Sequence, residues 1–195
     1  MIHRHYLHSL LAPRTVALVG ASERAGSLGS IVLRNLAAGA LEKLYAVNPK
    51  HRSVAGQPSY PSLRKLPGPV ELAVIATPAE TVTRIIEDAA AAGIRAAVVL
   101  TSGFGEAGPE GRKRQAAMLE AARRGGVRLL GPNCIGLMRT DTGLNATFAR
   151  TGARPGKLAL VSQSARSAAR SSTGRRAPTS AFRAWFRSAA RPTST

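Results

Sequence analysis

Short apolar runs alternate with helical patterns along most of the chain. The runs are typical of buried parallel strands, because they are almost unbroken by polar residues and each ends near Gly, Pro or Asn. They cover residues 15–21, 43–49, 70–78, 95–106 and 127–138, and the helical patterns between them cover residues 30–40, 79–93 and 109–126. This alternation predicts βαβ units, and therefore an α/β fold with a parallel sheet and helices on both faces.

The alternation also predicts how the chain is divided. We expect one domain over residues 8–139, followed by a connector rich in Gly, Thr and Pro over 140–156. A new apolar run at 157–164 is typical of the first strand of a second, incomplete α/β domain. Residues 165–195 contain mainly Arg, Ser, Ala and Thr, which predicts a disordered tail.

The charge is distributed unevenly. The chain has 28 Lys and Arg against 10 Asp and Glu, for a net charge of +18. The tail holds seven Arg and no acidic residue, so the body is only moderately basic and suits an anionic small ligand. A single cysteine, the absence of a signal-peptide pattern and the absence of a long apolar run predict a cytoplasmic protein without a membrane partner.

The loop after the first apolar run is the strongest candidate for chemistry. Gly20, Gly26, Ser27 and Gly29 stand between the expected strand and the helix that follows, where free backbone N–H groups favour phosphate. A tight turn without a ligand is the alternative reading. The spacing G-x5-G-x2-G differs from the dinucleotide fingerprint G-x-G-x-x-G.

The end of the second apolar run argues further against NAD. Lys50, His51 and Arg52 lie where an NAD site needs a carboxylate for the ribose. These cations favour a nucleotide with an additional phosphate, although an ordinary solvated basic turn explains them as well.

The sequence predicts no catalytic set and no metal site. Three histidines, His3, His5 and His8, lie in an N-terminal segment that we expect to be frayed and solvated. Cys134 has no obvious base beside it, and we interpret it as a small apolar filler. Glu106 either faces a pocket or is solvated near the next helix start.

Several motifs together resemble one known family. They are "TVALVGASERAGSLGSIVLRNL", "YAVNPKH", "LAVIATPAE", "AAVVLTSGFGEAG", "RLLGPNCIGLM", "GLNATFA" and "GKLALVSQS", in this order. The stretch of residues 7–164 resembles the CoA-binding domain of NDP-forming acyl-CoA synthetases, relatives of the succinyl-CoA synthetase α subunit. The sequences of these motifs especially resemble those of the large bacterial proteins in which this domain is fused to a GNAT-type acetyltransferase. The resemblance implies a Rossmann-like domain that binds CoA or acyl-CoA.

The same resemblance implies which residues form the site. The first loop would hold the CoA phosphates, Lys50 would meet the adenosine end, and the later strand ends would line the pantetheine arm up to the thiol. The implied set is Gly20, Ala21, Ser22, Ser27, Leu28, Gly29, Lys50, Thr77, Pro78, Thr101, Ser102, Gly103 and Asn133.

The resemblance also implies that other parts of such a synthetase are missing. The chain carries no phosphohistidine loop, and no ATP-grasp, complete flavodoxin-like or acetyltransferase region. We therefore expect the CoA-binding domain of a truncated acyl-CoA ligase or acetyltransferase fusion, inactive by itself. A stand-alone CoA- or nucleotide-sensing module that regulates a partner is the alternative.

The tail is best interpreted as the product of a frameshift, or of a gene-model error, in a longer synthetase-like protein. Codons read one base earlier permit the Gly-Ala-Leu, Ile-Leu-Asp-Trp-Ala and later residues that similar synthetases carry after "LALVSQS". A shifted GC-rich frame also explains the excess of Arg, Ala, Ser and Pro. A basic arm that binds nucleic acid is a further alternative, but we expect no nucleic-acid partner.

Overall fold

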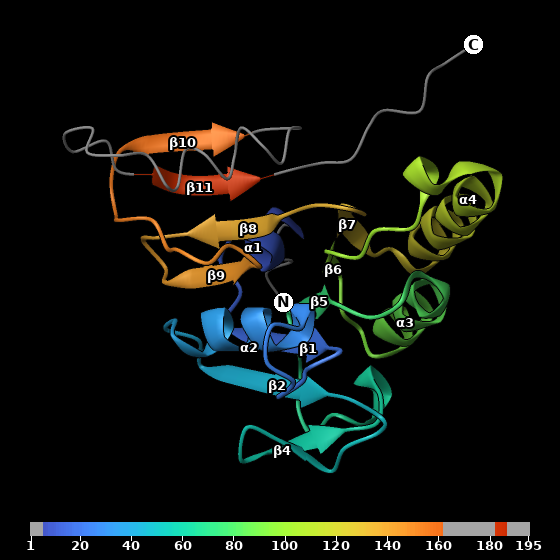
Figure 1. Ribbon diagram of the computed structural model, residues 1–195, viewed down its shortest axis with the longest axis horizontal. Helices are drawn as coiled ribbons and strands as arrows, with labels where there is room; N and C mark the ends of the chain where they lie inside the picture. The colour runs from blue at the N-terminus through green and yellow to red at the C-terminus, as the bar shows by residue number, and fades with distance from the viewer. Residues whose placement is uncertain (1–5, 162–181, 187–195) are drawn as a thin grey trace, which may run out of the picture.

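The computed structural model describes residues 6–161 and 182–186. A seven-stranded sheet forms the centre of the fold (Figure 1). The strand order is β3-β4-β2-β1-β5-β6-β7, and all neighbours are parallel except β3 and β4. The strands are β1 Thr15–Val19, β2 Lys43–Val47, β3 Ser53–Val54, β4 Gln57–Tyr60, β5 Leu72–Ile75, β6 Ala96–Val99 and β7 Arg128–Leu130. The prediction of an α/β fold with a mostly parallel, Rossmann-like sheet is confirmed.

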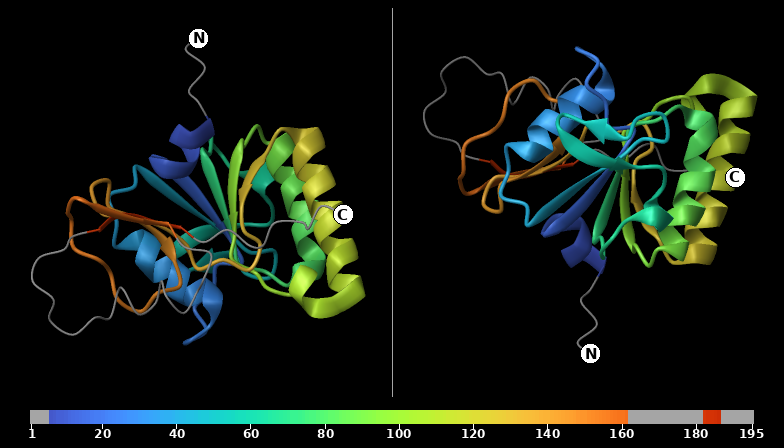
Figure 2. Two further views of the ribbon diagram at one scale, coloured as in Figure 1. Left: turned by 90° about the horizontal axis from the view of Figure 1, so that it is seen from above. Right: turned by 90° about the horizontal axis from the view of Figure 1, so that it is seen from below.

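Helices cover both faces of this sheet, as the sequence predicted. Figure 2 shows α3 and α4 stacked on one face and α1 and α2 on the other. The α-helices are α1 Tyr6–Leu11, α2 Leu28–Ala37, α3 Ala79–Ala91 and α4 Gly108–Gly125, and two short 3₁₀ turns are η1 Leu63–Lys65 and η2 Gly105–Ala107. The frayed start expected for the N-terminal segment is wrong from Tyr6 onward, because α1 forms there and buries Leu10. His3 and His5 lie outside the described residues.

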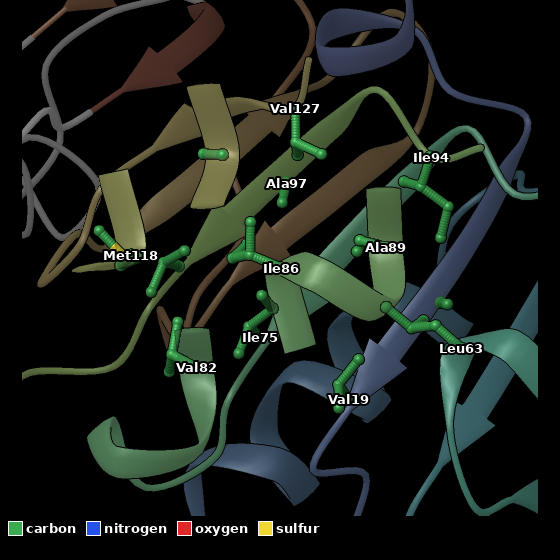
Figure 3. Packing of buried hydrophobic residues seen from close by; sticks show 14 of the residues in the cluster. Val19, Leu63, Ile75, Val82, Ile86, Ala89, Ile94, Ala97, Met118 and Val127 are labelled. Atoms are coloured by element: carbon green, nitrogen blue, oxygen red, sulfur yellow. The ribbon is translucent and has the colours of Figure 1, made fainter. Parts of the chain in front are cut away.

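Each strand divides its side chains between two cores. In β1, Ala17 and Val19 belong to the core beneath α3 and α4, whereas Val16 and Leu18 belong to the core beneath α2. This is the period of two that a strand imposes on its side chains. Figure 3 shows the first core, in which α3 and α4 meet the central strands. Burial on both faces explains why the strands are unbroken apolar runs in the sequence.

A second sheet follows, with the order β10-β11-β8-β9. Its strands are β8 Gly136–Arg139, β9 Leu144–Thr147, β10 Leu158–Val161 and β11 Phe182–Phe186. The expected fifth run therefore divides between two sheets, since β7 ends at Leu130 and β8 pairs with β9 as an antiparallel hairpin. The expected connector contains β9, whose Leu144 and Ala146 pack into the core beneath α2.

Two short strands are described in the C-terminal part. β10 lies within residues 157–164, and β11 is parallel to β10 and antiparallel to β8. The division of this part into the first strand of a second domain and a disordered tail stays a prediction. The other residues of the predicted tail lie outside the described part of the chain.

Asn35 joins α2 to the end of β9 and to the residues that follow it. Its side-chain Nδ2 donates hydrogen bonds to the carbonyl oxygens of Thr147 and Ala149, both at 2.9 Å. Thr147 is fully buried, so water cannot easily replace a lost partner there. The helix that begins at the first loop is thereby fixed to the second sheet.

We expect Asn35→Ala to lower the free energy of unfolding by about 1–3 kcal/mol, because it leaves two carbonyl oxygens without this donor. Urea unfolding followed by circular dichroism measures the change. Gln57→Ala, at an exposed position of β4, is the control and should change the free energy by less than about 0.5 kcal/mol. Equal stability of the two variants would contradict the role of Asn35.

Candidate functional site

The order of the strands places a crevice at the carboxyl ends of β1 and β5. The chain moves from β1 to β2 on one side and then returns to β5 on the other side of β1. The loops that leave β1 and β5 therefore diverge, and in open α/β sheets ligands bind at this topological switch point. Gly20 follows β1 directly, and Ala76 and Thr77 follow β5 directly.

Two glycines let the first loop fold tightly over this edge. Gly20 has φ +92°, and a Cβ there would lie 2.6 Å from the Ala76 carbonyl oxygen. A Cβ on Gly29, in the first turn of α2, would lie 2.0 Å from the Gly20 carbonyl oxygen. Only glycine allows either approach. The start of α2 is consequently held directly against the end of β1.

Ser27 is the N-cap of α2. Its Oγ accepts a hydrogen bond from the Ser30 N–H at 3.2 Å, and its backbone is extended. Ser22, earlier in the loop, accepts one from the Arg24 N–H at 3.1 Å. The N-terminus of α2 thus points to the switch point with its partial positive charge, where an anionic group is stabilised.

Asn48 connects the first loop to the end of β2. Its Nδ2 donates to the Ala21 carbonyl at 2.8 Å, and its Oδ1 accepts from the Lys50 N–H at 2.9 Å. Lys50, His51 and Arg52 are all exposed just beyond it. The turn after β2 is therefore fixed to the first loop and presents cations beside it.

A cleft of about 670 Å³ opens between these loops and α3. Its apolar lining comes from the strand ends, the loop at η1 and α3, namely Val19, Val47, Pro49, Pro61, Leu63, Ala76, Pro78 and Ile85. Its polar lining, beside Gly20, consists of Arg24, Asn48, Lys50, Ser62, Thr77, Thr81, Arg84 and Asp88. A cleft that combines apolar surface with polar and charged side chains is suited to a small molecule that has both kinds of group.

Hydrogen bonds continue from this cleft along the strand ends. The Thr101 Oγ1 donates to the Thr77 carbonyl at 2.7 Å, and the Asn133 N–H donates to the Thr101 carbonyl at 2.8 Å. Thr101 is buried, and Asn133 has φ +51°. The ends of β5, β6 and β7 are thereby joined into one edge that leads away from the cleft.

The loop after β6 is held by polar side chains of its own region. Glu106 accepts hydrogen bonds from the N–H groups of Gly103 at 2.6 Å and Phe104 at 3.3 Å. Arg114 donates to the Gly103 carbonyl, and Gln115 accepts from the Gly105 N–H at 3.0 Å. Glu106 is exposed, which agrees with the expectation that it is solvated near the next helix start. It also fixes the loop through these hydrogen bonds.

Cys134 is packed inside the protein. It is 1% exposed, and its Sγ lies 3.2 Å from the Val99 carbonyl oxygen. Burial is consistent with the interpretation of this thiol as a filler. The described residues include no group of three His, Cys, Asp or Glu side chains that could hold a metal ion.

The predicted site residues all lie at the carboxyl-end edge of the sheet, but only some of them line the cleft. Gly20, Lys50, Thr77 and Pro78 line the cleft. The rest lie outside its lining, along the first loop or the later strand ends, and comprise Ala21, Ser22, Ser27, Leu28, Gly29, Thr101, Ser102, Gly103 and Asn133. Ala21 and Gly29 are buried, so any contact of theirs with a ligand is through the backbone.

Sequence reasoning missed several lining residues. Ser62 comes from the loop at η1, and Arg24 lies in the first loop. Thr81, Arg84 and Asp88 come from α3. The sequence did contain a clue to the α3 residues. Thr81, Arg84 and Asp88 are spaced by three and four residues, which places them on one face of a helix.

The fold and the cleft define an α/β domain with a cleft at the topological switch point of a mostly parallel sheet. The sequence matches the CoA binding domain family over residues 14–140, which is more than half of the chain. The chain belongs to this family.

Relatives of known activity agree with this assignment. The chain is 42% identical over 158 residues to acetate–CoA ligase [ADP-forming] I of Archaeoglobus fulgidus, covering 81% of this chain and 23% of the relative. It is 40% identical to the α subunit of acetate–CoA ligase [ADP-forming] II of Pyrococcus furiosus, over 78% of this chain and 33% of that subunit. The chain thus matches only a fraction of these ligases.

Solved structures show the same architecture. The protein PH0766 of Pyrococcus horikoshii superimposes with a TM-score of 0.89 at 33% identity, over 94% of this chain and 42% of that one. An acetyl-coenzyme A synthetase of Ca. Korarchaeum cryptofilum in complex with phosphate and ADP gives 0.84 at 32% identity, over 94% and 39%. In the described part of the chain, no helix is long and apolar enough to cross a membrane.

Proposed function

We propose that the cleft holds the adenosine end of CoA and that the first loop holds its diphosphate. The observation that carries this proposal is the position of the cleft, which is lined by the first loop, the cationic turn after β2 and α3. The first loop leads directly from this cleft to the capped start of α2. Apolar side chains such as Leu63 and Ile85 offer a surface for the adenine ring. The turn after β2 has Lys50 where an NAD site needs an acid, which favours a ligand with an additional phosphate.

We propose that the pantetheine arm follows the later strand ends. The hydrogen bonds from Thr77 through Thr101 to Asn133 form a continuous edge that starts at the cleft. Ser102 is exposed on this edge, and Gly103 has φ +99°. The thiol, free or acylated, would then reach the turn at Asn133.

For the whole protein, we propose the CoA-binding part of an ADP-forming acyl-CoA ligase. The names of the relatives support a ligase, and the chain spans only 23% and 33% of two of them, which supports catalysis by other parts of such a protein. The resemblance found in the sequence implies that these parts are ATP-grasp and flavodoxin-like domains. The described chain offers no group that we assign to catalysis. A reducing cytoplasm suits the single, buried Cys134.

A stand-alone CoA-sensing module is the second candidate. It is favoured by one observation, namely that all the lining residues of the cleft come from a single stretch, residues 19–88. Within the described chain, the cleft therefore needs no residue from the later strand ends.

Calorimetric titration of the full chain with CoA tests the proposal. We expect saturable one-to-one binding, and a melting temperature that rises with CoA concentration because the ligand binds only the folded state. A folded chain that releases no heat with CoA and shows no such rise would contradict CoA binding by this chain.

We expect Lys50→Gln to weaken CoA binding about threefold to tenfold, since an exposed cation beside a phosphate contributes on the order of 1 kcal/mol. Lys157→Gln is the matched control, because Lys157 is also exposed but lies outside the lining of the cleft. Equal affinities of the two variants would show that Lys50 does not meet the ligand.

A further inference from the structure

We propose that Arg84, on α3, makes the cleft select a ligand with a phosphate on its ribose, and so makes the chain prefer CoA to dephospho-CoA. This inference rests on the proposed function. Arg84 lies outside the loops that the sequence singled out, and it lines the cleft from the helix side.

The start of α3 is fixed at the end of β5. The Thr81 Oγ1 donates to the Pro78 carbonyl at 2.7 Å and lies 2.9 Å from the Thr77 Oγ1. Thr81, Arg84 and Ile85 all line the cleft, so one face of α3 borders it. Arg84 is three residues beyond Thr81, which places it about 4.5 Å further along the helix axis at 1.5 Å per residue.

The charge of Arg84 is available to a ligand. Three cations line the cleft, Arg24, Lys50 and Arg84, and each comes from a different element. None of them takes part in the ion pairs found between described residues. Asp88 is the one acidic residue that lines the cleft among the described residues, and no ion pair joins it to Arg84.

The phosphates of CoA fall on two sides of its ribose. A diphosphate at the start of α2 lies beyond the end of β1, on the side of Arg24. Arg84 belongs to the helix that follows β5, so we assign to it, together with Lys50, the phosphate on the 3′ oxygen of the ribose. A guanidinium suits this group, because its planar N–H donors match two phosphate oxygens at once.

Titration of the full-length chain with CoA and with dephospho-CoA tests the inference, since the two ligands differ only in this phosphate. We expect the wild type to bind CoA about fivefold to tenfold more tightly than dephospho-CoA, as one partly exposed charge-assisted contact allows. Arg84→Gln should reduce this preference at least threefold, leaving only the contribution of Lys50, and should change the affinity for dephospho-CoA less than about twofold. Arg84→Lys should retain part of it.

Arg112→Gln is the matched control, because Arg112 is an exposed helical arginine outside the lining of the cleft. It should keep the full preference for CoA. An Arg84→Gln variant that keeps the preference, or that weakens both ligands equally, would overturn the inference and leave CoA binding intact. A folded wild type that binds neither ligand would overturn the proposed function together with the inference.

Discussion

Gly29→Ala is expected to abolish detectable CoA binding and to lower the free energy of unfolding by about 2–3 kcal/mol, at the upper end of the cost of overpacking. The new Cβ would lie 2.0 Å from the Gly20 carbonyl oxygen. That oxygen cannot move easily, since the Gly20 N–H is bonded to the Val47 carbonyl at 2.9 Å. The helix start must move instead, and it carries the N–H groups that we propose for the diphosphate. Urea unfolding and CoA titration measure the two effects.

Two other glycines separate a steric clash from a backbone effect. Gly152 has nothing within 4 Å of a Cβ and lies outside the left-handed region, so Gly152→Ala should change neither stability nor binding. Gly26 also has open space but has φ +73°, so Gly26→Ala should cost about 1 kcal/mol through its backbone alone. If Gly29→Ala resembles Gly152→Ala, the close approach of α2 to β1 does not determine binding.

The sheet and its helices could be predicted because each element satisfies one local rule. The side chains of β1 are buried on both faces, so the strand is an unbroken apolar run that ends in Gly20. In contrast, β3 and β4 are two and four residues long, with Pro58 in the pairing, and offer no such pattern. The hairpin of β8 and β9 was missed because β8 continues the fifth apolar run of the sequence, whereas β9 lies in the stretch expected to be a connector.

The site could be predicted only where the backbone makes it. In the first loop, tight turns need glycine and the start of a helix favours serine, so Gly20, Gly29 and Ser27 could be recognised from the sequence. Arg84 and Asp88 reach the cleft only because the opposite side of α3, with Val82 and Ile86, turns to the core. That orientation depends on tertiary packing. Glu106 shows the same limit, since the sequence could not reveal that it binds the N–H groups of its own loop.

Phe104→Ala is expected to lower the free energy of unfolding by about 3–5 kcal/mol, a large share of the 5–15 kcal/mol typical of a domain. Phe104 is fully buried in the core beneath α3 and α4, and its removal leaves a cavity there. Its backbone is held as well, because its carbonyl accepts from the Ala107 N–H at 2.7 Å. Urea unfolding measures the loss.

Leu119→Ala is the control, since Leu119 lies on α4 and is 45% exposed, and it should cost less than about 1 kcal/mol. Equal losses for the two variants would show that the loop after β6 is not anchored in the core.

Ligand binding by the folded part of a Phe104→Ala sample also tests the proposed pantetheine path. Phe104 directly follows Thr101, Ser102 and Gly103, which we propose lie along that path. A loosened loop should weaken CoA binding by more than it weakens binding of adenosine 3′,5′-bisphosphate, which lacks the arm. Equal weakening of both ligands would place the arm elsewhere.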